Sequence, residues 1–169
     1  GAGVLRMVER WMGEERFRDA IRVYLRAHEH GTAVSADLFR ALADASPERP
    51  LDATLRTFVE TPGVPELSVD LVCDASGRKV TVTQRRFSLP AGAHHEGGPW
   101  AVPVCVRYPE GARTAVACAL VEGAQGEVSL GAGTCPAWVM PNADAGGYYR
   151  WSLPPARLAS LVAQGWASL

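Results

Sequence analysis

The feature that most constrains the fold is a change in hydrophobic period near residue 65 of this 169-residue chain. Before it, apolar residues recur at helical spacing, as in Val4, Val8, Trp11 and Met12. After it, apolar and polar residues alternate, which is the pattern of a half-buried strand. The order of the two patterns predicts a helical segment followed by a β-rich one.

Four helices are expected before the change of period. Gly13 separates the first two, and Gly31 ends the second in the C′ position that favours glycine. Ser35 is the expected N-cap of the third helix, because its hydroxyl can accept a backbone N–H. Pro50 opens the fourth helix, and residues 61–65 end the helical part.

The expected sheet begins with a hairpin of residues 66–73 against 78–87, which turns at Ser76-Gly77. Short strands separated by turn signals are typical of an antiparallel sandwich. The further strands are expected at 100–106, 114–121, 128–130, 138–139 and 148–151.

A final helix opens at Pro154-Pro155 and places Leu158, Leu161 and Val162 on one face. The expected fold class is therefore α+β: about four N-terminal helices, an antiparallel β-sandwich and a short C-terminal helix. The expected division is into residues 1–65, 66–152 and 153–169.

Charge argues against nucleic acid as a partner. The 17 basic and 18 acidic residues give a net charge of −1, whereas nucleic-acid binding usually needs a basic face. Arg85 and Arg86 are a candidate anion or RNA patch beside the Arg-rich second helix, but neighbours on a strand point to opposite faces. We expect an ion pair for one and solvent for the other. No apolar run reaches the ~18 residues of a membrane span.

The four cysteines do not form a zinc-ribbon signature, because no two are close enough for a CxxC knuckle. Cys73, Cys105 and Cys118 lie in β-like apolar runs, where a free cysteine behaves as a small buried hydrophobe. We expect reduced structural thiols, with Cys135 the fourth, and hence a cytoplasmic location. The even count also allows disulfides.

The histidines do not form a metal-binding pattern. His28 and His30 are two apart on an expected helix, so they point about 200° apart. His94, His95 and Glu96 lie in a Gly-rich stretch and need a distant further ligand, so a solvated surface loop is expected. The HExxH pattern that puts two histidines on one zinc is absent from the sequence.

Other catalytic and ligand-binding signatures are incomplete. There is no GxSxG elbow, and Gly131-Ala132-Gly133 lacks the third glycine and the helix of a dinucleotide loop. Asn142 and Asp144 resemble part of a calcium loop, but Leu153 stands where the bidentate Glu would be. We expect no catalytic, cofactor-binding or metal-ligating residue in this chain.

Seven separated motifs occur in the order found in one family. They are residues 1–7, residues 14–31 ending in His30-Gly31, Asp37-Leu38 with Ala41-Leu42, residues 58–65, Gln84-Arg85-Arg86-Phe87, residues 100–104, and Asn142 with residues 147–150. Together they resemble the zinc aminopeptidases of the aminopeptidase N (membrane alanyl aminopeptidase) type. The chain departs from the family pattern at Phe58, where a Trp is usual.

The resemblance implies a fragment of a longer parent enzyme. Residues 1–65 would be the helical tail of the thermolysin-like catalytic domain, 66–152 the small β-sandwich domain, and 153–169 the first helix of the C-terminal helical domain. The parent would use zinc-activated water to remove N-terminal amino acids from peptides. Its HExxH region, its further Glu ligand and its transition-state Tyr would all precede Gly1, so this chain would be inactive and hold no zinc.

In this interpretation the segment is structural. The sandwich would brace the catalytic domain, and Trp11, Trp100, Trp138 and Tyr148 would be core or domain-contact groups. Its partners would be the other domains of the same polypeptide, and the parent's would be a peptide substrate. We also expect partly bare apolar faces on the first two helices and the last one, which favour self-association. The alternative is a standalone β-sandwich binding or interaction module.

Overall fold

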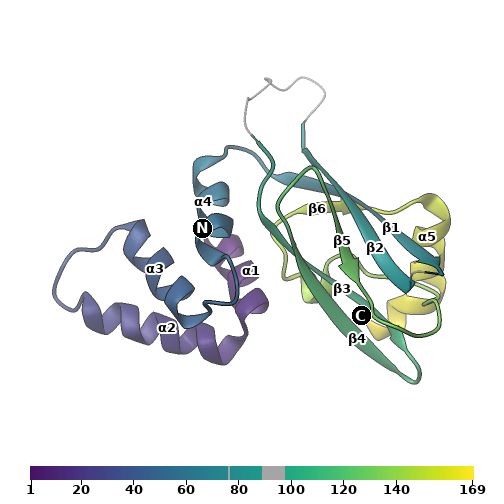
Figure 1. Cartoon of the computed structure of the whole chain (residues 1–169), viewed down its shortest axis with the longest axis horizontal. Helices are drawn as coiled ribbons and strands as arrows, with labels where there is room; N and C mark the ends of the chain where they lie inside the picture. The colour runs from purple at the N-terminus through teal and green to yellow at the C-terminus, as the bar shows by residue number, and fades with distance from the viewer. Residues whose placement is uncertain (76, 89–97) are drawn as a thin grey trace.

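The computed structural model describes residues 1–75, 77–88 and 98–169. Four N-terminal helices lie beside a β-sandwich, and the C-terminal helix packs on the side of the sandwich away from them (Figure 1). This is the α+β fold class expected from the change of hydrophobic period. The helical and strand patterns of the sequence therefore correspond to a helical part and a β-rich part that meet near residue 65.

The helices are α1 (Ala2–Met12), α2 (Glu14–Ala27), α3 (Ser35–Ala45) and α4 (Leu51–Glu60). Gly13 joins α1 to α2 with a φ of 96°, a left-handed conformation that glycine adopts without steric cost. All four helices are amphipathic, so each buries one stripe of apolar residues.

The expected N-cap of α3 is wrong by one residue. Ser35 is the first helical residue, and Val34 takes the N-cap position. The Val34 N–H donates to Asp37 Oδ2 at 3.0 Å. The side chain that satisfies the exposed backbone donor is therefore the carboxylate in the first turn rather than the serine hydroxyl.

The strands form two sheets, a four-stranded one in the order β5-β2-β1-β6 and a hairpin of β3 and β4. All pairs are antiparallel except β1 with β6, which run parallel. A strand expected at 138–139 is absent from the described residues, where Met140 forms a single bridge with Arg107. The bounds are β1 Pro65–Asp74, β2 Gly77–Arg86, β3 Val102–Glu110, β4 Arg113–Val121, β5 Gln125–Ser129 and β6 Arg150–Ser152.

The core of the sandwich consists of the inward-facing residues of β1, β2 and β3. Alternate side chains along each strand are buried, as the period of two requires. Removing this apolar surface from water stabilises the fold by about 25 cal/mol per Å². The residues are Leu67, Val69, Leu71, Val80, Val82, Val102, Val104 and Val106.

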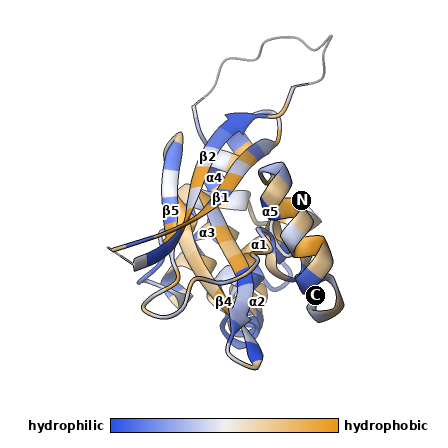
Figure 2. Cartoon of the chain, turned by 90° about the vertical axis from the view of Figure 1, so that its right-hand side faces the viewer, coloured by the Kyte–Doolittle hydropathy of each residue, from blue (hydrophilic) through white to orange (hydrophobic). Residues whose placement is uncertain are grey.

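The chain ends in three short helical pieces: α5 (Pro155–Ser160), a π turn (Leu161–Gly165) and a 3₁₀ turn (Trp166–Ser168). Leu161 is buried, but Val162 and Trp166 are 56% and 69% exposed. Figure 2 shows hydrophobic, orange segments of ribbon on the helical turns next to the C-terminus. The last helix therefore has the partly bare apolar face expected from the sequence.

The expectation of a partly bare apolar face is wrong for the first helix. Val4, Val8 and Met12 of α1 are buried against the rest of the chain. On α2 it holds in part, because Val23 and Leu25 are exposed while Ala20 is buried. The apolar face of α1 is covered because this helix contacts α2, α4 and β3.

Candidate functional site

The most elaborate set of polar and aromatic contacts lies where α1 meets the loop before β6. Gly3, Met7 and Arg10 lie on one face of α1, because residues three and four apart are neighbours on a helix. A Cβ at Gly3 would lie 2.7 Å from Cδ2 of Tyr148, so the absence of a side chain lets the ring contact the helix. The Tyr148 N–H donates to Sδ of Met7 at 3.3 Å.

Asp144 extends this contact by one further turn of α1. Its Oδ1 accepts a hydrogen bond from Nη2 of Arg107 on β3 at 2.5 Å, and its Oδ2 lies 3.6 Å from Nη2 of Arg10. Asp144 has a φ of 54°, a left-handed conformation that Asp tolerates better than most residues. One carboxylate thus joins the first helix to the sandwich.

The loop itself is closed by two buried side chains. Asn142 Nδ2 donates to the Gly147 carbonyl at 3.1 Å, and Asn142 Oδ1 accepts the Gly147 N–H at 2.7 Å. The Tyr149 hydroxyl donates to the Pro141 carbonyl at 2.9 Å. Burial raises the pKa of Tyr149 far above its ordinary value, so the phenol stays neutral and donating. We name residues 142–149 the junction loop.

An aromatic cluster continues the junction toward α4. Phe58 of α4 lies edge-on to Tyr148, with ring centroids 6.2 Å apart, and 6.5 Å from the ring of Trp100. The backbone of Trp100 is fixed by Gln84, whose Oε1 accepts the Trp100 N–H at 2.7 Å and whose Nε2 donates to the Trp100 carbonyl at 3.0 Å. Trp100 and Trp138 are buried, and Tyr148 contacts α1, as expected for core or contact groups.

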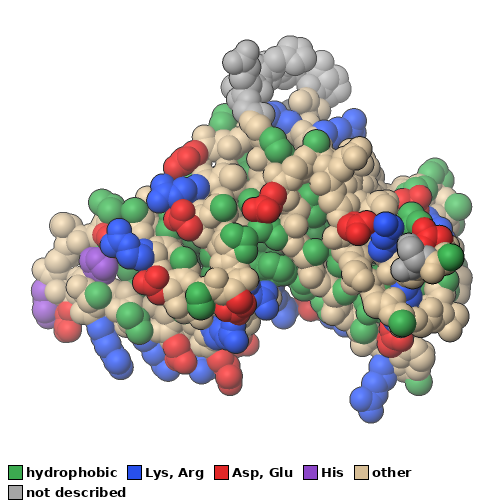
Figure 3. All heavy atoms as spheres, viewed as in Figure 1, with side chains coloured by type: hydrophobic (Ala, Val, Ile, Leu, Met, Phe, Trp, Pro, Cys, Tyr) green, Lys and Arg blue, Asp and Glu red, His purple; other side chains and the backbone are tan. Residues whose placement is uncertain are grey.

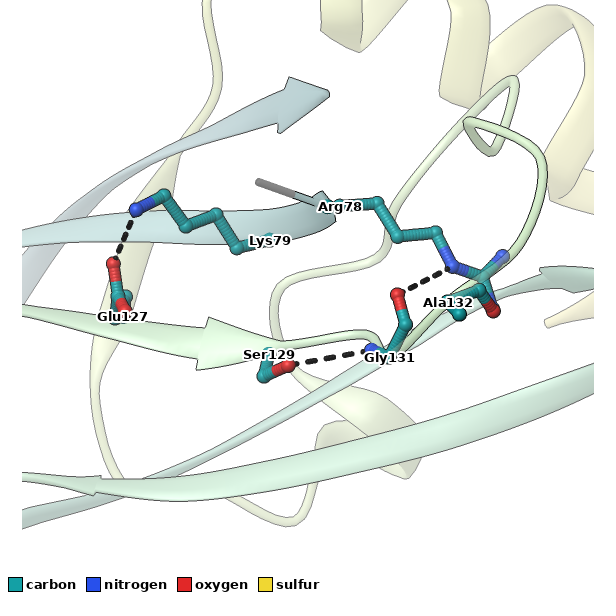
Figure 4. Close-up of a pocket in the computed structure, with 7 residues that line it drawn as sticks. Arg78, Lys79, Glu127, Ser129, Gly131 and Ala132 are labelled. Atoms are coloured by element: carbon teal, nitrogen blue, oxygen red, sulfur yellow. Dashed lines mark hydrogen bonds and ion pairs between the residues drawn. The ribbon is translucent and has the colours of Figure 1, made fainter. Parts of the chain in front are cut away.

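A second cluster lines an open pocket of about 480 Å³ at the start of β2 (Figure 4). Arg78 is buried, and its guanidinium donates to the carbonyls of Gly131, Ala132 and Thr134 and to Glu110. A buried arginine needs such acceptors, since an unpaired buried charge is costly. Its chemistry is to hold the 131–134 segment rather than to bind a nucleotide.

The other charged groups of this pocket are also paired. Lys79 Nζ lies 2.7 Å from Glu127 Oε2, and the pair raises the pKa of Lys79, first through the hydrogen bond to Glu127. Ser129 Oγ accepts the Gly131 N–H at 3.3 Å. Because each of these charged groups is paired within the protein, the residues of this pocket stabilise the local structure.

The structure separates the candidate metal ligands. His28 Nδ1 lies 2.9 Å from the Tyr24 carbonyl, and its Nε2 lies 3.5 Å from Asp37, whereas His30 is exposed on the turn after α2. His94, His95 and Glu96 lie outside the described residues. Within residues 1–75, 77–88 and 98–169, no three His, Cys, Asp or Glu side chains are grouped to hold a metal ion.

The incomplete calcium motif is part of the junction loop. The amide of Asn142 is used by Gly147, and the carboxylate of Asp144 by two arginines. The motif therefore signals loop closure. This role was missed from the sequence, although the Asn142-to-Gly147 spacing was the available signal.

Arg85 and Arg86 lie on opposite faces, as the strand period predicts. Arg85 forms the expected ion pair, with its Nε 3.0 Å from Glu66 Oε2. The expectation of solvent for Arg86 is wrong, because its guanidinium is stacked over Trp100, 4.9 Å from the ring centroid. Basic and acidic side chains are interspersed on the face seen in Figure 3.

The expectation of four reduced thiols is also wrong. Cys73 forms a disulfide with Cys135, and Cys105 with Cys118. Cys105 and Cys118 are direct partners in the register of β3 and β4, which brings their side chains to one face. The signal in the sequence was their symmetric placement about the turn at Gly111.

The helices of the described residues are not long and apolar enough to cross a bilayer.

Comparison with known proteins identifies the family. The model of the Peptidase family M1 domain matches residues 1–61, which are the four helices α1 to α4.

Curated relatives extend this similarity into the sandwich. Tricorn protease-interacting factor F2 of Thermoplasma acidophilum is 33% identical over 152 residues, which are 90% of this chain and 17% of the relative. Puromycin-sensitive aminopeptidase of Caenorhabditis elegans is 29% identical over 94% of this chain and 17% of its own length. Aminopeptidase N of Lactococcus lactis subsp. lactis is 30% identical over 62% of this chain and 12% of its own length.

The fold and these matches define an M1-type peptidase segment. The chain belongs to the M1 peptidase family, in agreement with the resemblance to the aminopeptidases N. It spans 17% of the length of each of the first two relatives.

Proposed function

We propose that this chain is a non-catalytic segment of a zinc-dependent aminopeptidase that removes N-terminal amino acids from peptides by metal-activated water. The observation that carries the proposal is the family match over α1 to α4, together with the contacts of the junction loop to the first of these helices at Gly3, Met7 and Arg10. Similarity to relatives named as aminopeptidases supports the reaction class.

The proposed role of the segment is to brace the catalytic domain. The junction loop contacts three successive points on one face of α1, and Arg107 connects the loop to β3. A helix held at several points against a disulfide-linked sandwich has fewer ways to tilt. The sandwich therefore sets the angle and position of the first helix.

The proposed domain division follows the element bounds. Residues 1–65 form the helical tail of the catalytic domain, 66–152 the sandwich domain, and 153–169 the first helix of a C-terminal helical domain. The exposed apolar residues Val162 and Trp166 fit a helix that packs against further helices of the same polypeptide.

The described residues of this chain do not fit zinc. A catalytic zinc site needs three protein ligands, typically His and carboxylate, on one side of the ion. His28 and His30 are apart, and the acidic groups near the junction are paired with arginines. We propose that the zinc of the parent enzyme is held by residues outside this chain, and we derive no reaction step from the residues present.

The cytoplasmic location expected for the parent loses its support, which was the reduced state of the cysteines. Two disulfides join all four of them. Disulfides persist mainly in oxidising compartments. The proposed partners of the segment are the remaining domains, and the peptide substrate is a partner of the parent.

The experiment is to purify the 169-residue chain and measure bound zinc by mass spectrometry and the release of chromophore from alanyl and leucyl anilides. The proposal predicts no stoichiometric zinc and no activity above a blank. Stoichiometric zinc, or activity that survives repurification, would contradict it.

The alternative is a standalone β-sandwich binding module. The observation that favours it is that β1, β2 and β3 each bury a complete inward-facing stripe of side chains, although these belong to one core cluster with the helices. It predicts that residues 66–152 carry a specific ligand site of their own, whereas the aminopeptidase proposal predicts a contact role. Ligand binding that is retained when the junction loop is altered would favour the alternative.

A further inference from the structure

The disulfide between Cys105 and Cys118 lies on the outer face of the β3–β4 sheet, toward the helical part. The neighbours of each cysteine along its strand pack into the core, so the cysteines themselves project from the opposite face. Helix α1 contacts β3, which places the disulfide where the helices meet the sheet. The neighbours that pack into the core are Val104, Val106, Ala117 and Ala119.

The two cysteines of this disulfide differ in access. Cys118 is exposed and lines an open pocket of about 530 Å³ between β4 and the turn from α1 to α2 at Gly13. Cys105 is half-buried, and the cavity beside it measures about 10 Å³. That volume is at or below what one water molecule needs. A dissolved reagent therefore reaches the disulfide from the side of Cys118.

Arg10 lies beside both cysteines, because it lines the open pocket with Cys118 and the small cavity with Cys105. Its Nη2 lies 3.6 Å from Oδ2 of Asp144, whose other oxygen is held by Arg107 at 2.5 Å. This one ion pair occupies only part of the five N–H donors of a guanidinium. A positive charge beside a departing sulfur stabilises the thiolate and so favours exchange at the disulfide.

The wall of the open pocket is fixed and does not repel an anion. Arg49 stacks over Trp11, 4.5 Å from the ring centroid, and its Nη1 donates to the Trp11 carbonyl. Glu48, the carboxylate that lines this pocket, is paired with Arg16 and Arg49. An approaching thiolate therefore meets two guanidinium groups and one neutralised carboxylate.

We propose that this disulfide is a thiol-exchange site, at which a small thiol becomes attached to Cys118. The thiol loses its proton to water, and its thiolate sulfur attacks Sγ of Cys118. The bond between the two protein sulfurs breaks, and its electron pair leaves with Sγ of Cys105 as a thiolate beside Arg10. A second thiol molecule that attacks the mixed disulfide leaves both cysteines reduced and the two reagent molecules joined as a disulfide. The site does not depend on the proposed aminopeptidase role.

The test is to treat the folded 169-residue chain with reduced glutathione without air and to stop the reaction with N-ethylmaleimide. Arg107 and Arg113 lie between the two cysteines, so trypsin separates them for mass spectrometry. We expect glutathione on Cys118 and the maleimide on Cys105. Glutathione mainly on Cys105, an equal division between the two, or no glutathione on Cys118 would overturn the proposal.

Single-cysteine variants measure access directly, without the competing return of the disulfide. Cys105→Ala leaves a thiol at Cys118, and Cys118→Ala leaves one at Cys105. With 5,5′-dithiobis(2-nitrobenzoate), the thiol of Cys118 should react about tenfold faster or more, because exposure controls its reactivity. Near-ultraviolet circular dichroism checks that both variants are folded, and equal rates in two folded variants would contradict the proposal.

The role of Arg10 is tested by the rate of glutathione exchange in matched variants. Arg10→Gln should slow exchange about threefold or more, and Arg10→Lys should keep most of the rate, because it keeps the charge. Asp144→Asn removes the same ion pair but leaves Arg10, so it should not slow exchange.

Arg26→Gln controls for net charge, because Arg26 is exposed on α2 and lines neither the pocket nor the small cavity. It should leave the rate of exchange unchanged. A full rate in a folded Arg10→Gln variant, or an equal loss in Arg26→Gln, would overturn the assignment of Arg10.

Discussion

The contact between Gly3 and Tyr148 gives the sharpest prediction about the junction. In Gly3→Ala the new Cβ would lie 2.7 Å from Cδ2 and 3.2 Å from Cε2 of Tyr148. Ordinary carbon contacts are about 3.5–4.0 Å, so the ring or α1 must move. Overpacking of this kind costs about 1–3 kcal/mol, whereas alanine in place of glycine gains up to about 1 kcal/mol in a helix.

The two effects oppose each other, and the overpacking is expected to dominate. Gly3→Ala should lower the free energy of unfolding by about 1 kcal/mol, measured by urea denaturation with circular dichroism. In a Tyr148→Ala background the same change should become neutral or stabilising, since only the helix preference remains. Gly1→Ala is the matched control, because no atom lies within 4 Å of a Cβ there. A stabilising Gly3→Ala with Tyr148 present would refute the reasoning.

The remaining predictions concern the disulfides, the junction charge and the C-terminal face. Removing the disulfide at Cys73, which spans 62 residues, should lower the free energy of unfolding by about 4 kcal/mol. Removing the disulfide at Cys118, which spans 13 residues, should lower it by about 3 kcal/mol. Chemical denaturation that ranks the two losses in reverse would contradict the loop-length argument. Asp144→Asn keeps a residue that tolerates the left-handed conformation, so it should cost about 1 kcal/mol or less, with a smaller loss in high salt; a loss independent of salt would argue against the ion pairs. Trp166→Ser should reduce concentration-dependent self-association of the chain in sedimentation, and a monomeric unchanged chain at high concentration would oppose this.

The β-hairpin shows what the sequence determines well. The expected strands 66–73 and 78–87 differ by about one residue at each end from Pro65–Asp74 and Gly77–Arg86. Alternation decides which side chains face the core, and a shift of one residue would expose all of them. Local pattern and tertiary burial therefore agree in this part of the chain.

The cysteines and arginines show where local pattern was insufficient. An apolar run around Cys105 describes its strand, but its pairing with Cys118 depends on the register across the β3–β4 turn. Arg78 reads as a solvated charge in an alternating strand, yet the segment around Ala132 folds back and surrounds it with carbonyls. Both outcomes depend on residues that are distant in sequence.

For the junction loop, the sequence predicted separate motifs but not the contacts between them. Asn142 and Gly147 were singled out by resemblance, and Asp144 by an incomplete calcium pattern. Their joint role required the position of α1, more than 130 residues earlier in the chain, beside the loop. Gly3 carries no side chain that sequence reasoning could assign to chemistry, and its importance follows from the close approach of Tyr148.

The central claim is that this chain is a non-catalytic part of a zinc aminopeptidase. The measurement that tests it most directly is the sequence of the coding region upstream of the Gly1 codon. The account predicts an uninterrupted reading frame that encodes an HExxH motif, which would bring two histidines onto one zinc. An initiation codon directly before Gly1, with no such motif in frame, would contradict it.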